Sequence, residues 1–109
     1  MEINILEKLE TIIKARRDNP EEGSYTCYLF EKGRDKILKK VGEETAELII
    51  AAKNGEREPI VMEAADLFYH VAVLLAEAGV PVEDVTAELS KRAEKMGNLK
   101  KMRDTDKNT

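Results

Sequence analysis

Apolar residues recur at intervals of three and four along most of this chain, which is the spacing of amphipathic helices and not of strands. The first such run comprises Ile5, Leu6, Leu9, Ile12 and Ile13. It predicts a helix over residues 3–17. The same periodicity predicts longer helices over 34–53, 58–78 and 81–96.

Residues that form turns and caps set the boundaries of these helices. The polar segment 18–23 contains proline and glycine and predicts a loop. Ser24 is placed to cap a short helical turn that runs through Phe30. Gly55 is expected to close the helix before it, and Pro81 to open the last one. These helices and their short connections predict an all-α fold, a four- to five-helix bundle.

Chain length and two unusual segments set the expected organisation. With 109 residues the chain fits one domain, assigned to residues 1–96, followed by a polar C-terminal tail over 97–109. Segments 48–52 and 71–76 are apolar all around their helices, so each requires cover on every side. A second copy of the chain would provide that cover. We therefore expect a homodimer that completes the bundle.

The charge balance narrows the range of partners. There are 22 acidic and 18 basic residues, a net charge of −4, which disfavours a nucleic-acid-binding surface. Cys27 is the single cysteine and cannot form an internal disulfide. The N-terminal segment lacks the apolar core of a signal peptide, and no apolar run reaches membrane length. We expect a cytoplasmic protein without a membrane or nucleic-acid partner.

Two pairs of carboxylates stand three residues apart on consecutive predicted helices. Glu44 and Glu47 belong to the first helix, and Glu63 and Asp66 belong to the second. At about 100° per residue, Glu44 falls inside the apolar stripe of its helix and Glu47 at the edge of that stripe. Glu63 and Asp66 lie at the edge of the apolar face of theirs. Since helices joined by a short turn pack antiparallel, the two pairs are expected to face each other.

Such a cluster favours a bound cation. Neighbouring carboxylates repel each other and are costly to bury, and a cation removes both costs. Ligation by carboxylate oxygens alone favours Mg²⁺ or Mn²⁺ over Zn²⁺ or copper. A di-iron site needs two Glu-x-x-His pairs, which the single histidine, His70, excludes. One Glu-x-x-Glu is usually solvated surface, but two acidic pairs on adjacent helices favour a metal site.

The order Glu44-x-x-Glu47, fifteen residues, then Glu63-x-x-Asp66 resembles the signature of the MazG-like all-α nucleoside triphosphate pyrophosphohydrolases. The surrounding sequences at 23–26 (GSYT), 39–44 (KKVGEE) and 63–70 (EAADLFYH) resemble one branch, the phosphoribosyl-ATP pyrophosphatases. The resemblance implies a Mg²⁺-dependent enzyme whose four carboxylates are metal ligands. It implies cleavage of phosphoribosyl-ATP between the α and β phosphates, giving phosphoribosyl-AMP and pyrophosphate in the second step of histidine biosynthesis. No fused cyclohydrolase domain is expected.

The same resemblance suggests further site residues, and most of them also have a purely structural explanation. Glu43 is either a base beside the ligands or an exposed partner of Lys39. Tyr25 and Tyr28 either stack on a base or pack, and His70 is expected to hydrogen-bond a ligand carboxylate. Lys40 either contacts phosphate or pairs with Glu44, which is worth only tenths of a kcal/mol, and Ser24 has its capping role as an alternative. The candidate phosphate-binding residues are Lys36, Lys40, Lys39, Arg34, Ser24 and Thr26.

Two other functions compete with this interpretation. A related pyrophosphohydrolase would act on free or damaged nucleoside triphosphates with the same carboxylates. A non-catalytic helical interaction module would carry these carboxylates as solvated surface. Binding of Mg²⁺ separates the module from both enzymes, and substrate comparison separates the two enzymes.

Overall fold

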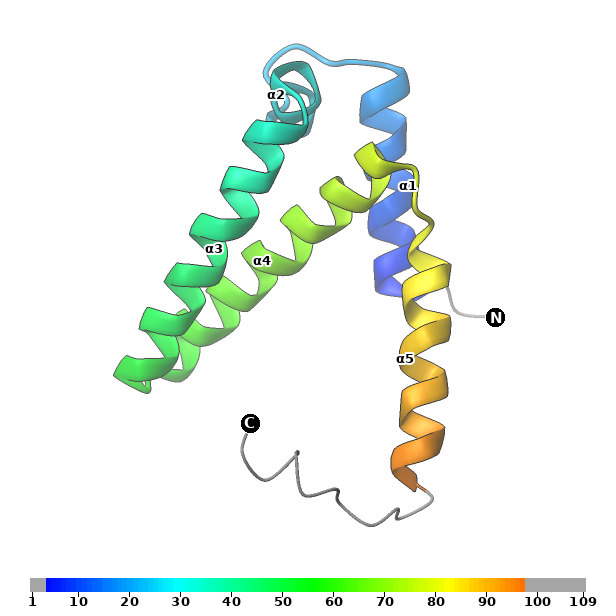
Figure 1. The fold of residues 1–109 in the computed structure, drawn as a ribbon. Helices are drawn as coiled ribbons and strands as arrows, with labels where there is room; N and C mark the ends of the chain where they lie inside the picture. Colours follow the sequence, from blue (N-terminus) through cyan, green and yellow to red (C-terminus); the bar gives the residue numbers. More distant parts are fainter. Residues whose placement is uncertain (1–3, 98–109) are drawn as a thin grey trace.

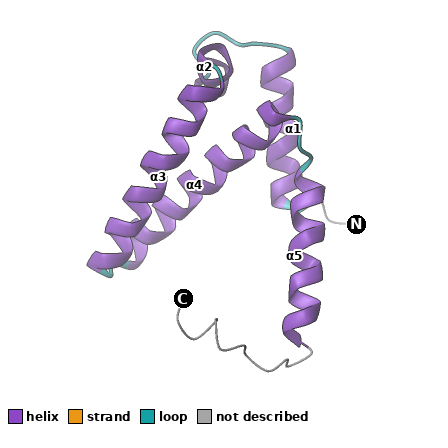
Figure 2. Cartoon of the chain, in the orientation of Figure 1, coloured by secondary structure: helices purple, strands orange, loops and turns teal. Residues whose placement is uncertain are grey.

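The computed structural model describes residues 4–97, which form five helices and contain no strand (Figures 1 and 2). The helices are α1 (Ile5–Asp18), α2 (Tyr25–Lys32), α3 (Arg34–Asn54), α4 (Arg57–Ala78) and α5 (Val82–Gly97). The all-α prediction is therefore confirmed. The predicted polar tail lies outside the described residues apart from Gly97, which ends α5.

Local capping chemistry explains most helix boundaries. The Asn4 side chain accepts a hydrogen bond from the Leu6 N–H at 2.7 Å, and Ser24 Oγ accepts one from the Cys27 N–H at 3.2 Å. Gly55 and Gly79 follow α3 and α4 with φ of +77° and +73°, the left-handed conformation that glycine adopts without strain. The segment after Ser24 is a complete helix of eight residues instead of a short turn ending at Phe30.

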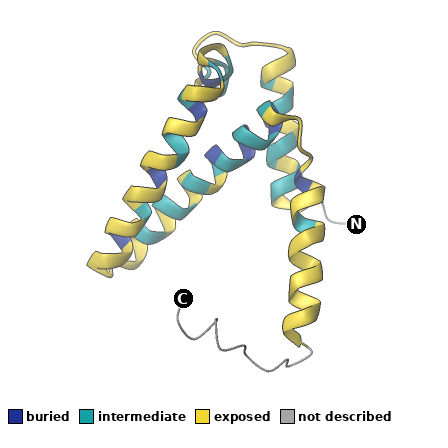
Figure 3. Ribbon diagram, viewed as in Figure 1, coloured by how far each residue is buried: buried dark blue, intermediate teal, exposed yellow. Residues whose placement is uncertain are grey.

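One apolar core joins four of the helices. It contains the buried residues Ile13, Leu29, Ile37, Ala72, Val73 and Ala76. These come from α1, α2, the start of α3 and the C-terminal half of α4. Figure 3 shows the buried positions gathered where these segments meet. The rest of the α3–α4 hairpin extends away from this core and carries mainly exposed and half-buried residues.

The single chain is an open arrangement and not a closed bundle. Its radius of gyration is 16.8 Å, whereas a compact domain of this length has about 13 Å. Helix α5 packs against α1 at its start, where Val82 is buried, and nearly all its later residues are exposed (Figure 3). Glu10 contributes to this contact, because its Oε2 accepts a hydrogen bond from the Val82 N–H at 2.8 Å.

The two segments expected to need outside cover behave differently. In 71–76, Ala72, Val73 and Ala76 are buried within the chain itself, and the other three residues are half-buried. Helices α1, α2 and α3 thus supply much of the cover of this segment without a second copy. In 48–52, Ile49 and Ile50 are 64% and 60% exposed. That surface remains without cover among the described residues.

Helix α4 is, by length and composition alone, long and apolar enough to cross a membrane. This helix is not one uninterrupted apolar run, because it combines an acidic N-terminal half, with Glu63 and Asp66, and a strongly apolar C-terminal half. The latter supplies much of the core of this chain, as the central helix of a helical domain does.

The core assignment is testable on α4 with two valines. Val73→Ala removes buried methyl groups and is expected to lower the free energy of unfolding by about 2 kcal/mol, at about 0.8 kcal/mol per buried methylene plus a cavity cost. Val61→Ala is the control, because Val61 lies on the same helix and is 57% exposed. Both changes bring the same gain in helix propensity. Urea denaturation that gave equal effects would contradict this core.

Candidate functional site

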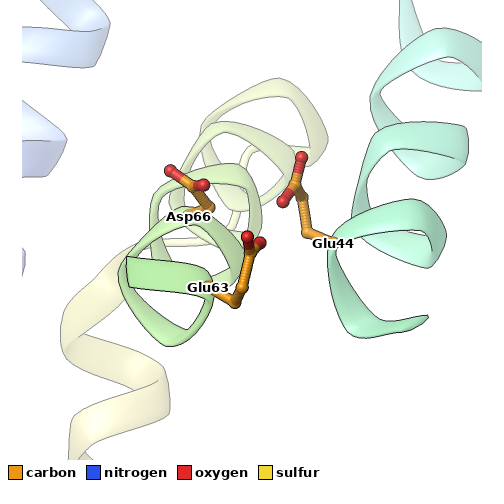
Figure 4. Close-up of side chains that lie close together, drawn as sticks. All are labelled: Glu44, Glu63 and Asp66. Atoms are coloured by element: carbon orange, nitrogen blue, oxygen red, sulfur yellow. The ribbon is translucent and has the colours of Figure 1, made fainter. Parts of the chain in front are cut away.

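Three carboxylates meet between α3 and α4. Glu44 comes from α3, and Glu63 and Asp66 come from α4; one oxygen of each lies within 4.8 Å of the others (Figure 4). The helical hairpin produces this meeting, because its two helices run antiparallel on either side of Gly55 (Figure 1). The sequence prediction that acidic edges of consecutive helices face each other is confirmed for these three residues.

The cluster lacks the partners that buried carboxylates need. Glu44 is 6% exposed, and Oε2 of Glu44 and Oε2 of Glu63 are both buried without a hydrogen-bond partner. The other oxygen of Glu44 lies 3.5 Å from Lys40 Nζ. Among residues 4–97, one ammonium beside three carboxylates leaves an excess of negative charge in a half-buried space, which is unfavourable. Oxygen-only donors with uncompensated charge fit a divalent cation such as Mg²⁺ or Mn²⁺.

Glu47 lies at the edge of this arrangement. It is one turn further along α3 and exposed, and it is not one of the three clustered carboxylates. It lines a hollow of about 250 Å³ together with Glu63, which places both at the same inter-helix gap. The structure thus brings three of the four predicted ligands together and leaves the fourth beside them.

Lys40 is the cation closest to the cluster. Its Nζ lies 3.5 Å from Glu44 Oε1 and 3.8 Å from Glu43 Oε1, so the ion pair with Glu44 is present. Partial burial acts to lower the pKa of Lys40, but interactions with Tyr25, Glu43 and Glu44 outweigh it and raise that pKa. Lys40 therefore carries its charge at neutral pH. The exposed Glu43 pairs with Lys40, whereas the sequence analysis gave Lys39 as its alternative partner.

The other candidate phosphate contacts are dispersed. Lys36 Nζ lies 6.0 Å from the centre of the Tyr28 ring, and Lys39 is exposed. Arg34 forms an ion pair with Glu77, which fastens the start of α3 to the end of α4. The hydroxyl of Thr26 bonds that of Tyr69.

The Ser24 hydroxyl caps α2, as its structural alternative predicted. The hydroxyls of Ser24 and Thr26 thus each form a hydrogen bond within the fold.

His70 makes a connection that sequence reasoning missed. It is 4% exposed, with Nδ1 2.7 Å from the main-chain oxygen of Asp66 and Nε2 2.9 Å from the Tyr25 hydroxyl. A carbonyl oxygen only accepts, so Nδ1 donates, and in the neutral ring Nε2 accepts from Tyr25. The expected bond to the carboxylate of a ligand was wrong, since the main chain of Asp66 takes its place.

Comparison with known proteins gives consistent matches. Residues 6–93 match the family described as Phosphoribosyl-ATP pyrophosphohydrolase. The phosphoribosyl-ATP pyrophosphatase of Clostridium botulinum is 53% identical over 102 residues, which cover 94% of this chain and 93% of that protein. The one from Clostridium acetobutylicum is 54% identical over 99 residues, covering 91% and 90%.

A longer relative matches over part of its length. The histidine biosynthesis bifunctional protein HisIE of Caldanaerobacter subterraneus is 56% identical over 93 residues, which are 85% of this chain and 45% of that protein. The resemblance drawn from the carboxylate pairs and their surrounding sequences is confirmed by these matches. The chain belongs to the phosphoribosyl-ATP pyrophosphohydrolase family.

Proposed function

We propose that this protein hydrolyses phosphoribosyl-ATP to phosphoribosyl-AMP and pyrophosphate, the second step of histidine biosynthesis. Family membership supports phosphoribosyl-ATP as the substrate, since the relatives are named for this activity. The observation that carries the chemistry is the pair of buried carboxylate oxygens, on Glu44 and Glu63, that have no partner. A folding role does not account for them, because an unpaired buried carboxylate destabilises a protein.

In this proposal Glu44, Glu63 and Asp66 hold Mg²⁺, and Glu47 joins them from the edge of the gap. Mn²⁺ has the same preference for oxygen ligands and can substitute. When bound, the ion neutralises phosphate oxygens and lowers the pKa of a coordinated water. A carboxylate of the site accepts the proton of the attacking water, for which Glu43 and Glu47 are the exposed candidates.

Basic residues on α3 hold the polyphosphate in this proposal. Lys40 is beside Glu44, and Lys36 lies one turn before it, so both reach a phosphate chain that ends at the cluster. Lys39 is a weaker candidate because it is exposed, and Arg34 because it is already paired with Glu77. Ser24 and Thr26 retain hydroxyl oxygens that can accept or donate a second hydrogen bond to substrate.

A related pyrophosphohydrolase acting on other nucleoside triphosphates would use the same carboxylates. A non-catalytic module is disfavoured, because it gives no reason to bury Glu44 among like charges. We further propose a cytoplasmic location, as befits a soluble enzyme of amino-acid biosynthesis.

We also propose a homodimer formed through the α3–α4 hairpin. Leu38, Gly42 and Ile49 lie along one exposed stripe of α3, while Val61 and Phe68 are exposed on α4. Large apolar side chains gathered on an extended hairpin are a typical association surface. The open shape of the single chain supports the same proposal.

The activity itself is tested with phosphoribosyl-ATP. Purified protein with Mg²⁺ or Mn²⁺ is expected to release pyrophosphate and no orthophosphate, and excess chelator should abolish turnover. Because a bound metal supplies several kcal/mol of transition-state stabilisation, chelation should reduce the rate by about 100-fold or more. Common nucleoside triphosphates and a damaged one serve as comparison substrates. Full activity in chelator would rule out the metal-dependent mechanism, and a preference for another triphosphate would favour the competing enzyme.

The metal site is tested separately by thermal melts of Glu44→Gln. Without metal, this variant should be as stable as the wild type or more so, because one buried charge is removed at nearly constant volume. Mg²⁺ at ten times its Kd stabilises the folded wild type by about 1.4 kcal/mol, or about 5–10 °C in Tm. The variant should show a much smaller rise. Glu43→Gln is the matched control. The carboxylate of Glu43 is next to Glu44 in the sequence but exposed, so its removal should leave the Mg²⁺-induced rise in Tm intact.

The homodimer is tested by light scattering at micromolar concentration. The expected mass is about twice that of the 12.3 kDa chain. Ile49→Glu places a charge on the exposed stripe of α3 and should shift the mass toward the monomer. Ile5→Glu is the control, because Ile5 is at least as exposed as Ile49 but lies on α1. A monomeric wild type, or a dimer insensitive to Ile49→Glu, would contradict the proposed interface.

A further inference from the structure

All three tyrosines of the chain and its single histidine lie in one cluster beside the carboxylates. The rings of Tyr25 and Tyr28 are stacked with centres 6.1 Å apart and planes at 23°. Tyr25 also contacts Tyr69 and meets the edge of His70 at 5.7 Å. Despite these contacts, Tyr25 and Tyr28 are 45% and 40% exposed.

Part-buried hydrogen bonds hold the ring of Tyr25 in place. The Tyr25 hydroxyl donates to His70 Nε2, and His70 is itself fixed by its Nδ1–H bond to the main chain of Asp66. Next to it, the hydroxyls of Thr26 and Tyr69 bond each other. Two consecutive residues of α2 are thereby tied to two consecutive residues of α4. The ring of Tyr25 is thereby fixed relative to α4, which lowers the entropic cost of binding a flat ligand against it.

A hollow of about 610 Å³ opens beside the two tyrosines. This volume lies in the range of small-molecule sites. Its walls are formed by the loop before α2 and by one side of α2, and the charged residues among them are Glu21, Glu22 and Glu31. An acidic wall repels phosphate but accepts hydrogen bonds from the hydroxyls of ribose and the amino groups of a base. The hollow therefore suits hydroxyl and amino groups and does not suit a phosphate.

Two cations lie near the ring of Tyr28. The Nζ atoms of Lys32 and Lys36 lie 5.8 Å and 6.0 Å from the centre of the Tyr28 ring. One turn after Lys36 comes Lys40, which contacts Glu44. From Lys36 to Glu44 the helix rises about 12 Å, so these side chains form a short basic path from the aromatic pair to the carboxylate cluster.

Tyr25 lies between the hollow and the cluster. It lines the hollow, and its hydroxyl is joined through His70 to the main chain of Asp66 in the cluster. Burial raises the pKa of Tyr25, Lys40 acts to lower it, and Glu44 is among the groups that raise it. The aromatic pair is thus continuous with the proposed site for phosphate and metal.

We propose that Tyr25 and Tyr28 form a stacking platform for the aromatic base of the nucleotide substrate, with His70 as the positioning residue of Tyr25. The triphosphate runs from this platform past Lys36 and Lys40 to Glu44, and the phosphate of the phosphoribosyl group on the base stays outside the acidic hollow. This assignment rests on the proposed nucleotide hydrolysis and adds an orientation to it. Stacking on aromatic rings recognises the flat face of a base, which every nucleotide presents.

The first test uses the intrinsic fluorescence of the protein. The chain contains no tryptophan and three tyrosines, so its fluorescence reports directly on this cluster. AMP should quench the signal saturably, whereas ribose 5-phosphate, which shares the sugar and phosphate but lacks the base, should not. Tyr28→Leu should weaken AMP binding by about 10-fold, in the range of a lost stacking contact. Equal responses to AMP and ribose 5-phosphate would overturn the platform.

The second test is the steady-state kinetics of platform variants. Tyr25→Leu and Tyr28→Leu should raise the KM for phosphoribosyl-ATP by about 10-fold, with kcat nearly unchanged and the Mg²⁺-induced rise in Tm retained. Unchanged KM in an active enzyme would overturn the platform while leaving the proposed function standing. Quenching by AMP without any pyrophosphate release would support the platform and contradict the proposed hydrolysis. Inhibition by inorganic tripolyphosphate, which has no base, should be equal in these variants and the wild type.

The positioning role of His70 requires a double variant. His70→Leu leaves the Tyr25 hydroxyl without its acceptor and should raise KM. Tyr25→Phe keeps the ring and removes that hydroxyl, so combining it with His70→Leu should restore part of the lost affinity. Additive losses in KM would show that His70 does not act through Tyr25 and would remove it from the proposal. A retained Tm in the double variant separates this result from a folding defect.

Discussion

The cost of burying the carboxylate of Glu44 shapes the rest of this structure. It occupies a position on α3 where helix packing favours an apolar side chain, and it faces Glu63 and Asp66 across the hairpin. Mutual repulsion opposes close packing of the hairpin at this level. The buried apolar cluster of the fold lies elsewhere, where α1 and α2 meet the start of α3 and the end of α4. The fold thus separates the part that stabilises it from the part that carries charge.

This separation depends on a few contacts that are distant in sequence. Arg34 pairs with Glu77, and Tyr25 bonds His70, so α2 and the start of α3 are tied to the C-terminal half of α4. The same ties place the aromatic cluster one turn from Asp66. Tyr25 and His70 therefore both stabilise the fold and lie at the edge of the proposed site. Loss of such a residue has two consequences, and measurements of stability and of KM are both needed to distinguish them.

Much of the fold and part of the site follow from local rules. Apolar spacing, Ser24 and the glycines after α3 and α4 place the helices to within about two residues. A rotation of about 100° per residue also places Glu44 inward and Glu47 at an edge. The bond of Tyr25 to His70 spans 45 positions and leaves no periodic signal. Likewise, composition shows that segment 71–76 is covered, but it does not reveal that α1, α2 and α3 supply the cover.

Gly42 illustrates how the exposed side of α3 departs from what stability alone favours. A Cβ at this position would meet no atom within 4 Å, so packing within the chain does not require glycine. Alanine in a helix interior is favoured over glycine by about 1 kcal/mol. The residue lies on the stripe with Leu38 and Ile49, where apolar side chains also face solvent in the single chain. The proposed homodimer would account for both departures, because a second copy of the chain on this face of α3 would cover the apolar side chains and could approach the helix closely at Gly42.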